Sequence, residues 1–142
     1  MWVTVHALSG LALGTLAPLE MVLIVLCSLA LHLLLDLVPH WDYTRHHLRT
    51  LWAVTDVVLS IAAVVTLALT LDLPLRAAVA AIVSALPDLD VFDAVMPGPA
   101  RRRWFPSHWQ RFPHGEARAA VGIPLQAVIA LGCVGGVIFT SL

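Results

Sequence analysis

The chain has 142 residues, of which 60% are hydrophobic and 12% are charged, and its formal net charge at pH 7 is −1. Soluble domains are about 45–50% apolar and about 25% charged, so this composition favours an integral membrane protein. The length leaves room for a single membrane-embedded helical domain over residues 1–142, with no separate soluble domain. The small net charge predicts no nucleic-acid partner.

Five apolar stretches are predicted to be helices. In chain order they cover residues 2–16, 21–38, 51–71, 75–96 and 119–142. A spanning helix needs about 20 residues, with a range of about 17–25, so the last four stretches are long enough to cross a bilayer. The first is marginal, because it can either cross with a tilt or enter as a half-helix packed on protein. We expect an all-α bundle of four or five transmembrane helices.

Two long polar connections carry most of the basic residues. Residues 39–50 and 97–118 contain seven of the eight, all arginine, and the eighth is Arg76. If every stretch crosses, both connections lie on one side of the membrane, and the positive-inside rule places that side in the cytoplasm. We therefore expect a multi-pass protein of the inner (plasma) membrane. Membrane lipids are the expected partners, with Arg101, Arg102 and Arg103 meeting anionic headgroups. The oligomeric state stays open.

A short repeat indicates that one structural device is used twice. Residues 37–42 match residues 85–90 at an offset of 48, and in both segments a proline ends a helix and acidic groups follow. Both helices are expected to run toward the cytoplasm. This is the form of a parallel helix-pair repeat.

Ionisable residues gather in the half of the protein that is expected to face the cytoplasm. They include His6, His32, Asp36, His40, Asp42, Asp56, Asp88, Asp90, His108 and His114. An unpaired aspartate at the bilayer centre costs about 2.5–3.5 kcal/mol on insertion scales, so such groups usually face a cavity or pair with one another. The chain has no lysine, and its arginines lie mostly in the connections. Another cation is therefore needed to neutralise the carboxylates.

Neutral histidine and carboxylate together are the ligand set of a divalent transition metal, zinc first and manganese second. His32 and Asp36 are four residues apart, so both lie on one helix face and can hold one ion. Asp88 and Asp90 could converge on one ion or bridge two. The expected metal ligands are His6, His32, Asp36, His40, Asp42, Asp88 and Asp90.

Three motifs resemble a family of small bacterial inner-membrane proteins, the LexA-regulated, membrane-bound metal-dependent hydrolases. They are Val5-His6-Ala7-Leu8-Ser9-Gly10, Ala85-Leu86-Pro87-Asp88-Leu89-Asp90 and Arg111-Phe112-Pro113-His114-Gly115. In the family these look like Thr-His near the start, Leu-Pro-Asp-x-Asp-His, and His-Arg-x-x-Thr-His-Ser. The resemblance implies a metal-dependent hydrolase.

This chain departs from the family pattern at three positions. Val91 stands where the family has a histidine, and Pro113 replaces threonine. Gln110 replaces the histidine before Arg111, although His108 is two residues away. The chain is therefore a divergent relative at most, and the segment from His32 to Asp42 could supply ligands that the later motif lacks.

Three functions stay open at this point. A hydrolase would use the metal to activate water and to polarise a phosphoryl or acyl oxygen, with Asp56 or His114 as general base. Its expected substrate is a lipid phosphoester or another amphiphile with an anionic head. A transporter would pass protons or a divalent cation, but the outer halves of the helices offer few polar residues. A scaffold would use the polar cluster only to fix helix packing, with Asp56 as a cap.

Overall fold

A computed structural model describes residues 1–95 and 103–142, without the side chains of residues 92 and 93. The helices are α1 (Val3–Leu16), α2 (Met21–Leu37), α3 (Arg49–Thr70), α4 (Leu75–Ala85), the single turn α5 (Phe92–Val95) and α6 (Ala119–Ser141). Three 3₁₀ segments join them: η1 (Tyr43–Arg45), η2 (Leu86–Val91) and η3 (Pro106–His108). The described residues thus confirm the predicted all-α class. Residues 97–102, the start of the second predicted connection with Arg101 and Arg102, lie outside the described residues.

Within the described part, two helices are long and apolar enough to cross a membrane. They are α3, with 22 residues, and α6, with 23. At about 1.5 Å per residue these helices are about 33 and 35 Å long, against a hydrocarbon core of about 30 Å. The apolar helices α1 and α2 are shorter, with 14 and 17 residues.

The prediction of one long helix over residues 75–96 was wrong. Helix α4 has 11 residues and ends at Ala85, after which the chain continues as η2 and α5. Pro87 lies directly after this end, and proline lacks the N–H that the next helical turn would need. Asp88 and Asp90 therefore lie in the 3₁₀ segment η2 and not in α-helix, in agreement with the predicted break at Pro87.

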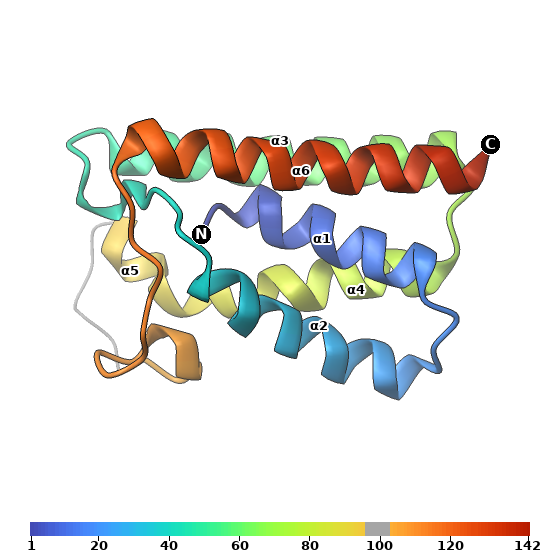
Figure 1. Cartoon of the computed structure of the whole chain (residues 1–142), viewed down its shortest axis with the longest axis horizontal. Coiled ribbons are helices and arrows are strands. Elements are labelled where there is room, and N and C mark those ends of the chain that lie inside the picture. Colours follow the sequence, from blue (N-terminus) through green and yellow to red (C-terminus); the bar gives the residue numbers. More distant parts are fainter. Residues whose placement is uncertain (96–102) are drawn as a thin grey trace.

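Helix α1 is the central element of the fold. Residues Val5–Ala12 are buried, and α1 contacts α2, α3, α4 and α6 (Figure 1). Its closest approach is to α4, where a Cβ added at Gly10 would lie 2.3 Å from the carbonyl oxygen of Ala80. A Cβ added at Gly14 would lie 2.5 Å from the carbonyl oxygen of Arg76. Two glycines four residues apart therefore let the two backbones touch.

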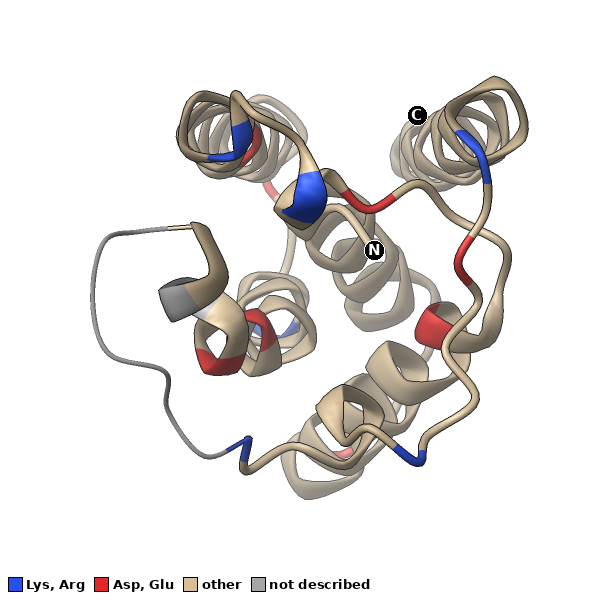
Figure 2. Ribbon diagram, turned by 90° about the vertical axis from the view of Figure 1, so that its left-hand side faces the viewer, with Lys and Arg blue, Asp and Glu red and all other residues tan. Residues whose placement is uncertain are grey.

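Both long connections lie at the same end of the helices, together with the N-terminus (Figure 1). The C-terminus and the short α1–α2 and α3–α4 turns lie at the opposite end. Figure 2 views the chain from the end with the long connections, where many of the acidic and basic residues are visible. Helices α2 and α4 both end here. Their continuations differ, however, because residues 38–42 leave α2 without forming the 3₁₀ helix that follows α4.

The second long connection is fastened to the end of α2 by backbone hydrogen bonds. Gly115 N–H donates to the Asp36 carbonyl (2.8 Å), and Ala117 N–H donates to the His40 carbonyl (2.8 Å). His40 N–H in turn donates to the Gly115 carbonyl (2.6 Å). A Cβ at Gly115 would lie 2.4 Å from the Val38 carbonyl oxygen, so a larger residue would push the connection away. This attachment brings His108 and His114 to the end of the bundle.

Candidate metal centre

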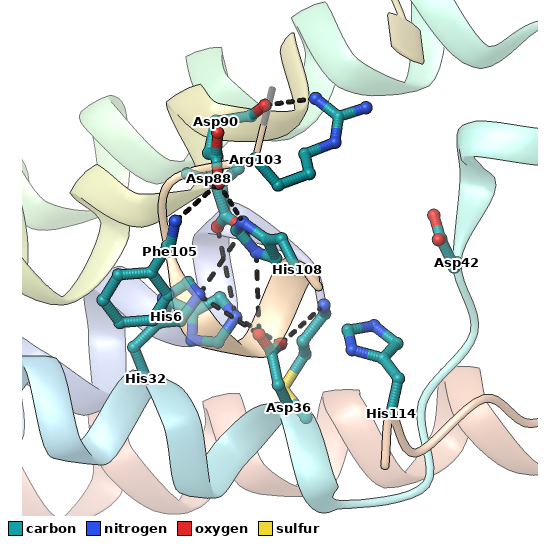
Figure 3. A network of polar contacts seen from close by, with 12 residues as sticks. His6, His32, Asp36, Asp42, Asp88, Asp90, Arg103, Phe105, His108 and His114 are labelled. Atoms are coloured by element: carbon teal, nitrogen blue, oxygen red, sulfur yellow. Dashed lines mark hydrogen bonds and ion pairs between the residues drawn. The ribbon is translucent and has the colours of Figure 1, made fainter. Parts of the chain in front are cut away.

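Five ionisable side chains converge at the end of the bundle to form what we term the central cluster. They are His6 from α1, His32 and Asp36 from α2, Asp88 from η2 and His108 from η3 (Figure 3). The side chains of His6, His32 and Asp36 are fully buried, and those of Asp88 and His108 are 10% and 5% exposed. Segments far apart in the sequence thus contribute to one enclosed polar site.

The distances within the central cluster fit a metal ion held by three residues, in two overlapping groups: His6, His32 and Asp36, and His32, Asp88 and His108. Asp36 lies 3.3 Å from His6 Nε2, 3.2 Å from His32 Nε2 and 3.7 Å from His108 Nε2. Asp88 lies 4.0, 3.9 and 3.9 Å from the same three nitrogens. Two ligand atoms on zinc, each at about 2.0–2.2 Å, cannot be more than about 4.4 Å apart. Every one of these separations lies within that limit.

Two of the histidines are oriented by hydrogen bonds on the far side of the ring. His32 Nδ1 lies 2.7 Å from the Ser84 carbonyl oxygen, which can only accept, so this nitrogen carries the proton. His108 Nδ1 lies 3.3 Å from Asp90 Oδ2. Both arrangements leave Nε2 with a lone pair facing Asp36 and Asp88. Metal-bound histidines in proteins are held in the same way, by a carbonyl or a carboxylate on the other nitrogen.

The facing atoms have no hydrogen-bond partner among the described residues. His6 Nε2, His32 Nε2, Asp36 Oδ2 and Asp88 Oδ2 are all buried without a hydrogen bond, and their close contacts are with one another, such as His32 Nε2 with Asp36 Oδ2 at 3.2 Å. A buried polar atom without a partner costs about 1–3 kcal/mol. Four of them around one point are costly as they stand, and a divalent cation would satisfy them together. The donor set of this cluster therefore fits a metal ion.

Burial keeps three histidines of the two long connections in the neutral form that binds metal. Burial lowers the pKa of His108 to about 4 and that of His40 to about 4. Burial also lowers the pKa of His114. All three rings are consequently neutral near pH 7, as a ligand nitrogen must be.

His40 and His114 form a second candidate group with Asp36. Their Nε2 atoms are 3.0 Å apart, and His40 Nδ1 lies 2.8 Å from the Val38 carbonyl oxygen. The Met1 amino group also lies here and donates to Asp36 Oδ1 at 3.1 Å. Asp36 thus belongs both to the central cluster and to this pair.

Two aspartates of the predicted site, Asp42 and Asp56, form hydrogen bonds away from the central cluster. Asp42 caps η1 by accepting from Thr44 N–H and Thr44 O–H, both at 2.8 Å. Asp56 accepts from the N–H groups of Val3 (2.8 Å) and Thr4 (3.0 Å) and from Tyr43 O–H (3.0 Å), so it caps the start of α1. Neither belongs to a candidate metal group of the described residues.

Asp90 holds the second connection in place rather than lying in a candidate metal group. Its Oδ2 accepts from Trp104 N–H (2.9 Å) and Phe105 N–H (2.8 Å), and the Arg103 guanidinium donates to its carbonyl oxygen. The same Oδ2 faces His108 Nδ1. Asp90 therefore positions His108, a role that the sequence did not indicate.

His108 is the member of the central cluster that was missing from the expected ligands. The available signal was the departure at Gln110, since a histidine two residues earlier could replace the one that the family motif has there. Comparisons with protein-family models, curated proteins and solved structures found no match to this chain. The resemblance to the membrane-bound hydrolases therefore stays a prediction from its motifs.

Proposed function

We propose that this protein is a multi-pass membrane protein that binds a divalent metal in the central cluster and uses it for hydrolysis. The observation that carries the proposal is the convergence of three histidine nitrogens and two carboxylates, four of whose facing atoms have no other partner. A purely structural polar network would be expected to satisfy its own buried atoms.

The exposed surface supports a membrane location. Leu69, Leu131 and Phe139 are 77%, 70% and 84% exposed, whereas His6, His32 and Asp36 are fully buried. Water would favour the opposite arrangement, since apolar surface is driven inward and charge outward. Lipid around α3 and α6 accounts for both features. By the positive-inside rule, the arginines of the two long connections favour the cytoplasmic side of an inner membrane for the proposed metal centre.

Zinc is the proposed metal, with manganese as the alternative. Three imidazole nitrogens with carboxylate oxygens suit zinc, and a higher proportion of oxygen ligands would favour manganese. Such an ion supplies a bound water of lowered pKa and polarises a substrate oxygen.

His114 is the proposed general base. It lies beside the central cluster at the open end, with His40 Nε2 3.0 Å from its own Nε2, and its ring is neutral near pH 7, the form that can accept a proton. Asp56 was the other candidate, but its oxygens are engaged at the start of α1.

Elemental mass spectrometry of the detergent-purified protein tests the metal site. We expect near-stoichiometric zinc or manganese in the wild type and in His47→Ala, whose ring is exposed and outside the candidate groups. The double variant His32→Ala/Asp36→Ala should contain none. If the wild type binds no metal after incubation with divalent ions, the proposal fails.

The hydrolase part needs a separate assay. The metal-loaded protein is incubated with a panel of phospholipids, and the products are followed by mass spectrometry. Metal-dependent release of a headgroup or a fatty acid, lost in His32→Ala/Asp36→Ala, is the expected result. Stoichiometric metal without turnover of any phospholipid would leave a binding protein instead.

A further inference from the structure

A large apolar groove lies between α3 and α4 and opens onto the central cluster. Its volume is about 1140 Å³, and its walls come mainly from α3 and α4. On α3 it is lined at helical spacing by residues such as Val57, Ile61 and Ala68. On α4 the facing residues include Ala78 and Ala85. The small side chains of α4 leave the space that a packed pair of helices would normally fill.

The groove ends in groups of the proposed metal centre. Asp88 and His108, two members of the central cluster, line it, and so does His114. Arg103 also lines this end and adds positive charge. A molecule in the groove would therefore have an apolar body between α3 and α4 and one end against the metal ligands.

The groove is long enough to hold an acyl chain from one leaflet of a bilayer. The lining residues of α3 extend from Ala53 to Leu69, which at about 1.5 Å per residue is about 24 Å. Half of the bilayer's hydrocarbon core is about 15 Å. Because the proposed metal centre lies at one end of the groove, a lipid chain entering from that leaflet would lie along the groove with its headgroup at the cluster.

We propose that the groove binds one acyl chain of a membrane glycerophospholipid and presents its phosphate ester to the central cluster. The inference rests on the proposed hydrolase function and adds the class of substrate. A phosphate oxygen is the hard, anionic ligand that a metal ion beside Arg103 attracts. The apolar walls select for a chain, and the polar end selects for its charged head.

Photo-crosslinking tests where the chain binds. The purified protein is placed in nanodiscs with phosphatidylglycerol that carries a diazirine at the end of one acyl chain, and labelled residues are mapped by mass spectrometry. We expect saturable labelling on the groove faces of α3 and α4, reduced by excess unlabelled phosphatidylglycerol. Diacylglycerol with the same chain, which lacks the phosphate, should label these positions more weakly. Even labelling over all exposed faces of α3 and α6 would overturn the proposal, since it would show surrounding lipid only.

A matched pair of variants tests the groove itself. Ile61 lines it and is 60% exposed, whereas Leu59 on the same helix is 57% exposed and lies outside the lining. Ile61→Trp should reduce labelling of α4 at least about fivefold, because an added indole overfills the space, whereas Leu59→Trp should not. Equal metal content and elution volume establish that both variants fold. Equal labelling in both would overturn the assignment.

The outcome separates this inference from the proposed function. Labelling confined to the groove in a protein that binds no metal supports the chain site and contradicts the hydrolase. Metal-dependent turnover with labelling outside the groove supports the hydrolase and overturns the chain site.

Discussion

At the scale of single residues, the site depends on what lies behind each ligand. His32 is oriented by a backbone carbonyl, and His108 is oriented by the carboxylate of Asp90. His6 has neither kind of partner among the described residues, since both of its ring nitrogens are buried without a hydrogen bond. The proposed ligands His32 and His108 are thus oriented by hydrogen bonds, whereas His6 is not. Substitution of Asp90 tests how much the orientation of His108 contributes to metal binding.

Asp90→Asn should weaken metal binding without disturbing the fold. The asparagine oxygen can still accept from Trp104 and Phe105, but the amide offers His108 Nδ1 no carboxylate. Loss of such a supporting group typically costs about 10–100-fold in metal affinity. Competition with a chromogenic zinc chelator measures the change. Asp42→Asn, which alters only the cap of η1, is the control, and equal affinities in the two variants would contradict the role of Asp90.

Asp56→Ala should destabilise the protein while leaving its metal affinity unchanged. The carboxylate accepts several hydrogen bonds at the start of α1. A hydrogen bond to a charged group contributes about 1.5–3 kcal/mol to the free energy of unfolding. We expect a loss of about 2–4 kcal/mol in the free energy of unfolding, measured by thermal unfolding in detergent. Glu20→Ala is the control, because Glu20 makes no cap hydrogen bond to α2. Reduced turnover at unchanged stability would instead assign Asp56 to catalysis.

At the scale of helices, the central position of α1 depends on two small residues. Gly10 and Gly14 face the backbone of α4, and this contact holds His6 at the depth of His32. The rings of His6 and His32 are stacked with their centroids 3.8 Å apart. Displacement of α1 along or away from α4 would therefore also separate these two ligands.

Gly10→Ala should destabilise the helix packing. Its methyl group would lie 2.3 Å from the Ala80 carbonyl oxygen, which is backbone and cannot rotate away. Overpacking of this kind costs about 1–3 kcal/mol, which exceeds the gain of up to about 1 kcal/mol in helix propensity. Gly132→Ala is the matched control, because its Cβ would meet open space. Unfolding in detergent should separate the two, and equal stability would show that α1 and α4 can move apart without cost.

At the scale of the whole molecule, the fold separates two environments. The end with the long connections holds the buried histidines and aspartates, and the bodies of α3 and α6 expose apolar side chains. The groove joins the two, because it begins among apolar residues of α3 and α4 and ends at Asp88 and His108. This continuity would let the proposed site act on a molecule that lies partly in the bilayer.

Cysteine accessibility should place the metal centre on the cytoplasmic side. In a variant without Cys27 and Cys133, a membrane-impermeant thiol reagent should label Asp72→Cys in intact spheroplasts. It should label His47→Cys only after the membrane is opened, because the positive-inside rule predicts that the arginine-rich connection lies in the cytoplasm. Both positions are exposed, so access to the reagent differs only by side. The reverse pattern would put the centre outside.

Sequence alone determined the features that depend on local pattern and on charge count. Runs of apolar residues predicted the positions of α1, α2, α3 and α6, because helix periodicity is a local property. The four-residue spacing of His32 and Asp36 placed both in one candidate site for the same reason. The excess of carboxylates over nearby fixed cations indicated a metal before any contact was known.

Only the tertiary structure decided which residues lie together in the candidate site. Asp56 binds the start of α1 from 52 positions away, and His32 is oriented by Ser84 at the same separation. His108 joins the central cluster because the second connection is fastened to α2 through Gly115. Helix α4 ends early, and the space left between α3 and α4 becomes a groove. Contacts of this kind depend on the packing of distant segments, which local periodicity does not encode.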